Sequence, residues 1–221
     1  LPINYAIDDL NHSGDKITAI AGIFSGTLSW LFESYDGTTA FSTLLLAALE
    51  QGITEPDPRE DLSGRDVQRK LLILARIAGF ELSLDDIECA NLVPEALQNL
   101  STQDFLARAD ELDQYFANAL NDAERKGCCI RYVARLAIAD SGSINGKVSL
   151  EVLAKSDAFA SLTPCDNIFQ ISSHWYQDNP LIIRGPGAGR DVTAGGLHSD
   201  LVNICQQLAH KQNQVKIKGI N

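Results

Sequence analysis

An acidic stretch followed by one lysine has the residue types and spacing that best suit chemistry. The segment 54–70 reads TEPDPREDLSGRDVQRK and carries five carboxylates before the lysine, namely Glu55, Asp57, Glu60, Asp61 and Asp66. Carboxylates this close together repel one another unless they bind a cation, such as a substrate amine or a lysine. Two prolines restrict the backbone conformations of the segment even when no ligand is bound, so holding the carboxylates in place costs little entropy. The stretch therefore predicts a site in which carboxylates hold an ammonium group.

Asp66 and Lys70 stand four residues apart, so a helix would present them on the same face. Ser63 has capping-box spacing to Asp66, and the apolar stripe that follows predicts a helix from about Gly64 to Ala78. Lys70 would then lie beside the acidic loop, with its ammonium reaching a cleft lined by the carboxylates. The alternative from local sequence is that Asp66 only caps the helix and forms a surface pair worth about 0.3 to 0.5 kcal/mol.

The elements that must position these residues are helices in the first half of the chain and strands in the second. A strand-like run from residue 17 breaks at Ser-Gly-Thr before a helix, and helices are predicted at 41–51 and at about 102–126, with 53–66 as a loop. A hairpin follows from Ile130, then the strand-like runs NIFQISSHWY and PLIIRG, a final helix, and a polar, frayed tail from Lys211. This order predicts an α+β fold, with helices packed on a mixed, mainly antiparallel sheet.

Composition excludes several classes of protein. The 221 residues carry a formal charge of −11, which argues against nucleic acid and anionic membranes as partners. No apolar run approaches the roughly 18 to 20 residues of a membrane span, so the chain is expected in the cytoplasm. Five irregularly spaced cysteines and four histidines fit neither a disulfide framework nor a metal site, so no metal is predicted.

Three segments together resemble homoserine dehydrogenase: the acidic run above, GIFSGTLSW at 22–30 and RGPGAGRDVTAG at 184–195. The likeness covers essentially the whole chain and includes the dehydrogenase portion of bifunctional aspartokinase/homoserine dehydrogenases of the methionine-branch type. The resemblance implies a small-molecule substrate and NAD(P)H-dependent interconversion of L-aspartate 4-semialdehyde and L-homoserine, a step in threonine, methionine and isoleucine biosynthesis. It also implies a homodimer.

The resemblance assigns roles within the acidic run. Lys70 matches the family's general acid, which donates a proton to the aldehyde oxygen, and an ordinary lysine is protonated at neutral pH. Glu55 and Asp66 match residues that hold the substrate. Asp61 matches a further acid that positions the lysine or the loop. Ile53 stands where some members carry tyrosine, so it offers the substrate no hydroxyl.

Two glycine-containing segments complete the implied site. Gly26 and Thr27 match a segment that lines the substrate pocket, although Gly26 alone also suits a simple turn. Gly187, Ala188 and Gly189 match a segment that contacts the nicotinamide side of the cofactor at the start of a helix. The alternative for this second segment is a hinge between domains.

The resemblance also predicts how the chain is organised. Residues 1–187 are expected to form the catalytic and dimerisation domain, and residues 188–221 a C-terminal helix and tail that pack on a nucleotide-binding domain. No G-x-G-x-x-G segment is present, so the chain is expected to begin after a Rossmann domain, with an aspartokinase domain further upstream. It would then lack most of the NADP- or NAD-binding surface. The alternative function is a substrate-binding and dimerisation module that is inactive by itself.

Overall fold

The computed structural model describes residues 1–139 and 142–218. The chain forms two compact units, Leu1–Gly187 and Ala188–Asn221. The second unit contains α9, which spans Arg190–Lys218. Its apolar residues Leu197, Leu201 and Ile204 are exposed by more than half of their surface. No described helix is long and apolar enough to cross a membrane.

The first unit is built on a sheet whose strand order is β2-β4-β3-β1-β5-β6. Every pairing between neighbours is antiparallel except the parallel pairing of β2 with β4. The strands span β1 Ile17–Ile23, β2 Ile87–Cys89, β3 Cys128–Ile138, β4 Ile144–Ala154, β5 Asp166–Ser173 and β6 Leu181–Pro186. The α+β fold with a mainly antiparallel sheet is therefore confirmed.

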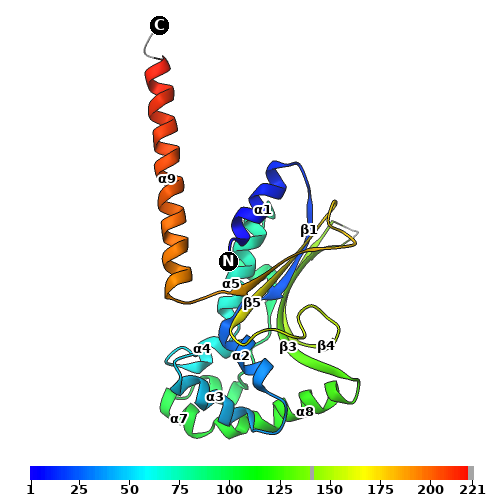
Figure 1. Cartoon of the computed structure of the whole chain (residues 1–221). Helices are drawn as coiled ribbons and strands as arrows, with labels where there is room; N and C mark the ends of the chain where they lie inside the picture. Colours follow the sequence, from blue (N-terminus) through cyan, green and yellow to red (C-terminus); the bar gives the residue numbers. More distant parts are fainter. Residues whose placement is uncertain (140–141, 219–221) are drawn as a thin grey trace. The chain divides into compact units, whose positions relative to one another are not determined.

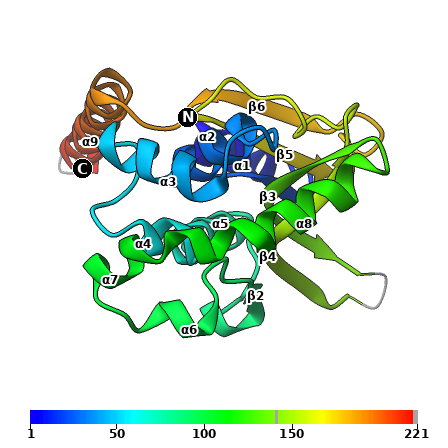
Figure 2. The same cartoon turned by 90° about the horizontal axis from the view of Figure 1, so that it is seen from below.

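Helices cover one face of this sheet, and Figures 1 and 2 show α1 and α5 side by side on that face. Alternate residues of β3, such as Tyr132 and Leu136, are buried beneath the helices, while Val133 on the other face packs against the segment after β4. The helices of the first unit are α1 Ile3–His12, α2 Gly26–Ser34, α3 Phe41–Glu50, α4 Pro58–Leu62, α5 Arg65–Ile77, the 3₁₀ turn η1 Leu84–Asp86, α6 Glu95–Gln98, α7 Thr102–Ala107, the 3₁₀ turn η2 Ala109–Leu112 and α8 Asp113–Glu124.

Three predictions about the helices were wrong. The expected loop at 53–66 contains α4, because Asp57 caps its first turn and Pro58 stands at its first position, where a missing N–H costs nothing. The expected helix at 102–126 is broken into α7, η2 and α8, although Leu112 and Phe116 are both buried, as the helical spacing predicted. The tail from Lys211 was expected to fray, but α9 remains helical to Lys218.

The predicted capping box at the start of α5 is also wrong. Gly64 precedes the helix with a positive φ of 71°, and no side chain caps α5. The Ser63 hydroxyl accepts from the Arg65 N–H instead of capping further into the helix. Asp66 is thereby left to interact with Lys70. The predicted helix itself is confirmed to within a residue at each end.

Candidate active site

The position of α5 is fixed by Gly64 and Tyr132. A Cβ atom on Gly64 would lie 1.9 Å from the Tyr132 hydroxyl oxygen, so only glycine lets the helix start here. Tyr132, on β3, donates a hydrogen bond of 2.6 Å to the Ala90 carbonyl. Val67 and Leu71 bury the inner stripe of α5 against the core. The opposite side of the helix, with its charged residues, therefore faces away from the core, and its position relative to the sheet is fixed.

Lys70 and Asp66 are in direct contact on that outward side. Lys70 Nζ lies 2.7 Å from Asp66 Oδ2 and donates a second hydrogen bond of 3.0 Å to the Phe24 carbonyl, just after β1. A lysine ammonium has three N–H donors. Among the described residues, these two acceptors are the partners of Lys70, so a third N–H is available for a ligand.

Asp61 ties the acidic loop to the start of α2. Its Oδ2 accepts a hydrogen bond of 2.8 Å from the Glu55 backbone N–H, and Thr27 also interacts with it. Burial raises the pKa of the Asp61 carboxyl above its usual value, against the lowering effect of these hydrogen bonds. The Thr27 hydroxyl donates to the Ile53 carbonyl at 2.8 Å. The structure thus brings the segments of Gly26–Thr27 and Glu55 together around one carboxylate.

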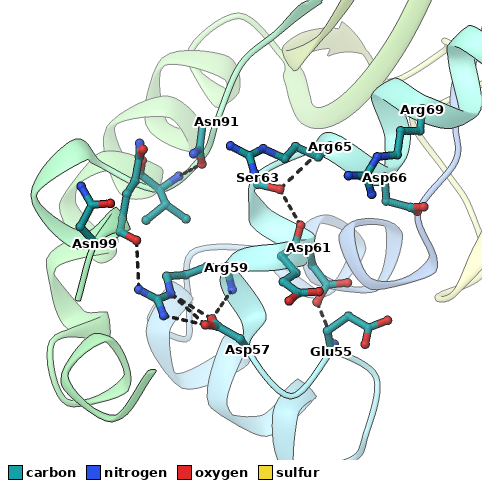
Figure 3. Close-up of a pocket in the computed structure, with 13 residues that line it drawn as sticks. Glu55, Asp57, Arg59, Asp61, Ser63, Arg65, Asp66, Arg69, Asn91 and Asn99 are labelled. Atoms are coloured by element: carbon teal, nitrogen blue, oxygen red, sulfur yellow. Dashed lines mark hydrogen bonds and ion pairs between the residues drawn. The ribbon is translucent and has the colours of Figure 1, made fainter. Parts of the chain in front are cut away.

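A polar cavity of about 650 Å³ opens beside this carboxylate. Three of the predicted site residues line it, namely Glu55, Asp61 and Asp66. Figure 3 shows the Asp57–Arg59 pair at one end of the cavity and Asp66 with Arg69 at the other. The remaining lining residues are Glu60, Ser63, Arg65, Asn91, Val93, Gln98 and Asn99.

Lys70 lines a second, more apolar cavity of about 190 Å³. Its other walls are Leu1, Ile3, Asn4, Ile73, Leu74, Asn167, Phe169 and Gly187. The structure therefore does not place Lys70 in the same cavity as Glu55 and Asp61. The Asp66–Lys70 ion pair stands between the two, because Asp66 lines the larger cavity and Lys70 the smaller.

The predicted glycines fall in different surroundings. Gly26 is the first residue of α2, and a Cβ there would lie 3.4 Å from the Cys165 carbonyl, an ordinary contact. Gly187 lines the smaller cavity, and a Cβ there would lie 2.2 Å from Asn167 Nδ2. Ala188 and Gly189 belong to the second unit, in which the Gly189 carbonyl accepts from the Thr193 N–H in the first turn of α9.

Asp57, Arg59 and Asn167 have contacts in the structure that the sequence did not predict. Arg59 Nη2 lies 2.6 Å from Asp57 Oδ2 and its Nη1 donates to the carbonyls of Leu97, Gln98 and Leu100. Asparagine is uncommon in strands, but β5 also contains Asp166 and Gln170, so no sequence pattern singled out Asn167. Among the described residues, no group of side chains has the composition of a metal site.

Comparison with known proteins identifies the family. The model of the homoserine dehydrogenase family matches residues 2–202. The chain is 50% identical over 210 residues to bifunctional aspartokinase/homoserine dehydrogenase 2 of Escherichia coli, covering 94% of this chain and 25% of that protein. It is 40% identical over 219 residues to homoserine dehydrogenase of Emericella nidulans, covering 94% of this chain and 59% of that protein. The chain thus spans between a quarter and three fifths of these relatives.

Solved structures share the fold. A Candida auris protein described as being of unknown function superposes with a TM-score of 0.86 at 38% identity, over 93% of this chain and 58% of that one. A homoserine dehydrogenase from Thiobacillus denitrificans superposes with a TM-score of 0.73 at 24% identity, over 92% of this chain and 42% of that one. The family match covers most of the sequence, and the chain belongs to the homoserine dehydrogenase family.

Proposed function

We propose that this chain forms the substrate-binding and proton-donating part of an NAD(P)-dependent homoserine dehydrogenase, which interconverts L-aspartate 4-semialdehyde and L-homoserine. The observation that carries the proposal is the Lys70 ammonium, fixed by Asp66 and the Phe24 carbonyl at the boundary between an acidic cavity and a smaller apolar one. Family membership supports the same reaction.

The acidic cavity suits the amino-acid end of the substrate. Glu55 and Asp66 line it, and carboxylates in a partly dry pocket form strong, charge-assisted hydrogen bonds with an ammonium group. The backbone N–H of Glu55 is held by Asp61, which orients the loop. Gly26 and Thr27, at the start of α2, line neither cavity, and the proposed contribution of Thr27 is to hold the Ile53 carbonyl beside the acidic loop. Asp61 thus acts on the loop, while Glu55 and Asp66 contact the substrate.

The proposed chemical role of Lys70 is proton transfer. Two of its N–H bonds are directed at Asp66 and the Phe24 carbonyl, so the tetrahedral geometry of the ammonium fixes the direction of the third. In the reduction, that third N–H donates its proton to the aldehyde oxygen as the alcohol forms. In the oxidation, the lysine takes the proton back. A positioned general acid contributes about 10²-fold to 10⁴-fold in rate.

The smaller cavity suits the reactive end of a nicotinamide cofactor. Its volume of about 190 Å³ is below the roughly 300 Å³ at which ligand pockets begin, so it has room for a ring and not for a dinucleotide. Phe169 and Gly187 line it beside Lys70, and Ala188 and Gly189 follow directly in sequence. When bound, NAD(P)H supplies the hydride that reaches the aldehyde carbon. The rest of the cofactor would bind to a separate nucleotide-binding domain.

The proposal includes the setting of the chain in its parent protein. Residues 1–187 would form the catalytic and dimerisation domain of a homodimer, and residues 188–221 would pack on the nucleotide-binding domain. Like the Escherichia coli relative, the parent protein would carry an aspartokinase domain upstream. A cytoplasmic location agrees with the five cysteines, all of which are free thiols. The plant relatives are named as chloroplastic.

A chimera tests the proposal. This chain replaces the matching segment of the Escherichia coli bifunctional relative, and NADPH oxidation is measured with L-aspartate 4-semialdehyde. The proposal predicts substrate-dependent turnover in the chimera and none when the segment is deleted. A thermal unfolding transition of the dehydrogenase part that matches that of the unsubstituted relative shows that the exchanged segment is folded. A folded chimera without turnover above background would refute the proposed function.

A further inference from the structure

We infer that Asn167 is a positioning residue for Lys70, acting through the Phe24 carbonyl. Asn167 lies on β5, and its Nδ2 donates a hydrogen bond of 3.3 Å to the Phe24 carbonyl oxygen. That oxygen also accepts the bond of 3.0 Å from Lys70 Nζ. A carbonyl oxygen has two lone pairs, so both donors bind it at once. The inference deepens the proposed function, because it concerns the same lysine.

The orientation of the Asn167 amide follows from its partner. Turning the amide over would place Oδ1 against the Phe24 carbonyl, where two acceptors repel each other. Nδ2 therefore faces Phe24, and Oδ1 faces away. The ring of Phe24 stacks on Phe169 of the same strand at a centroid distance of 4.6 Å. Asn167 and Phe169 thus hold Phe24 at both its carbonyl and its ring.

Stability does not explain an asparagine here. Asn167 is only 7% exposed, and its Oδ1 is buried without a hydrogen-bond partner among the described residues. A buried acceptor without a partner costs stability, whereas an apolar side chain of similar size would not. Departures of this kind from the most stable choice are expected where a residue serves function. The hydrogen bond to Phe24 is the feature that an apolar residue would lose.

Gly187 packs directly against the Asn167 amide. A Cβ on Gly187 would lie 2.2 Å from Asn167 Nδ2 and 2.6 Å from its Cγ, so a side chain there would displace the amide. Both residues line the smaller cavity with Lys70. Asn167 is therefore held between the glycine segment after β6 and the carbonyl that orients the lysine. It links the proposed cofactor side of the cavity to the proton donor.

The consequence concerns the direction of the third N–H of Lys70. Pinning the Phe24 carbonyl fixes one of the two bonds that orient the ammonium, and Asp66 fixes the other. Without Asn167 the carbonyl is free to shift, and the proton then points away from its target. Misplacing a catalytic group by about 1 Å costs up to about 10²-fold in rate. Substrate binding by Glu55 would be unchanged, so the effect falls on kcat and not on KM.

The kinetic test uses the chimera with Asn167→Leu, which keeps the size of the side chain and removes the donor. We expect kcat to fall about 10-fold to 100-fold, with KM for L-homoserine and the thermal unfolding midpoint retained. Gly187→Ala should lower kcat in the same way. Gln170→Leu is the matched control, because it makes the same change three residues along β5 on the opposite face of the sheet, and it should leave kcat unaltered. Unchanged kcat in Asn167→Leu would overturn the inference.

A spectroscopic readout separates this inference from the proposed function. The ¹⁵Nζ resonance of Lys70 is followed by NMR in this chain, with Lys70→Arg used to assign it. Asn167→Leu should shift the resonance, and Gln170→Leu should not. If the resonance moves while the chimera is inactive, the positioning role stands and the proposed reaction fails. If Asn167→Leu leaves the resonance where Gln170→Leu leaves it, the positioning role is contradicted, whatever the turnover of the chimera.

Discussion

The ion pair between Asp57 and Arg59 anchors the end of the acidic loop that lies away from Lys70. Arg59 also donates to three carbonyls at the end of α6 and just after it, so one guanidinium joins the loop to a segment 38 to 41 residues further along the chain. Its planar arrangement of donors suits several acceptors at once. The pair accounts for the order of a loop whose many carboxylates would otherwise repel one another.

This pair gives a prediction about stability and pH. Hydrogen bonding from Arg59 lowers the pKa of the Asp57 carboxyl to about 2 from its ordinary 3.8. A depressed folded-state pKa stabilises the fold above the ordinary value, and this stabilisation is lost as the pH falls from 3.8 to about 2. Asp57→Asn should therefore lower the unfolding free energy at neutral pH and reduce its dependence on pH in this acidic range.

Denaturant unfolding at several pH values measures this effect. Asp8→Asn is the matched control, because this substitution makes the same chemical change at an exposed position of α1. The control should follow the parent chain throughout. If Asp57→Asn and the parent lose stability in parallel between these pH values, the pair does not contribute as described.

At the scale of single elements, α5 depends on the glycine that precedes it. Gly64 has a φ of 71°, which disfavours any residue with a side chain, and a Cβ there would clash with Tyr132. Gly64→Ala should lower the unfolding free energy by about 1 to 3 kcal/mol. Because α5 carries Asp66 and Lys70, the same variant should also lower turnover in the chimera.

Gly52→Ala provides the comparison for this variant. Gly52 has a similar φ of 67°, but no atom lies within 4 Å of a Cβ built on it. The difference between the two variants therefore reports the clash with Tyr132 separately from the backbone strain. Equal losses of stability in thermal unfolding would show that Tyr132 does not fix the start of α5.

The elements with a strong repeating pattern were predictable from the sequence. The alternation from Ile130 gave the hairpin β3–β4, and the apolar spacing gave α3 and α5. The short α4 was missed because two prolines suggested a loop, although proline is favourable in a first helical turn. The helix predicted at 102–126 was wrong because its apolar spacing persists across the 3₁₀ turn η2. Local patterns do not report such a turn.

The site was predictable only in part, for a similar reason. The contact between Asp66 and Lys70 follows from their spacing on one helix. The separation of Lys70 and Glu55 into neighbouring cavities depends on how α5 sits above β1, which local sequence does not specify. The bonds from Lys70 and Asn167 to the Phe24 carbonyl join residues 46 and 143 positions apart. A backbone carbonyl leaves no signal in the sequence.

At the scale of the whole molecule, the first unit contains the entire described hydrophobic core. Among the side chains that the structure describes, every buried apolar residue lies before Gly187, whereas the large apolar residues of α9 up to Leu208 are exposed. A chain that ends at Gly187 should therefore fold cooperatively, with a thermal unfolding midpoint close to that of the full chain. It should also associate less at high concentration, because it lacks the exposed stripe that includes Leu197, Leu201 and Ile204.

Calorimetry and light scattering test both parts of this prediction. Truncation after Ala154 is the contrasting variant, because it removes β5 and β6 and uncovers β1, and it should abolish cooperative unfolding. Loss of cooperative unfolding in the chain that ends at Gly187 would mean that α9 is needed for the core. The mass of that chain also tests the proposed homodimer, which requires about twice the mass of one chain.

The central claim is that the Lys70 ammonium donates the proton in the reaction. The most direct measurement is kcat of the chimera with Lys70→Ala, compared with Lys126→Ala, which removes an exposed lysine that lines neither cavity. We predict that kcat falls about 10²-fold to 10⁴-fold in Lys70→Ala and is unchanged in the control. A kcat for Lys70→Ala equal to that of the unsubstituted chimera would contradict the account.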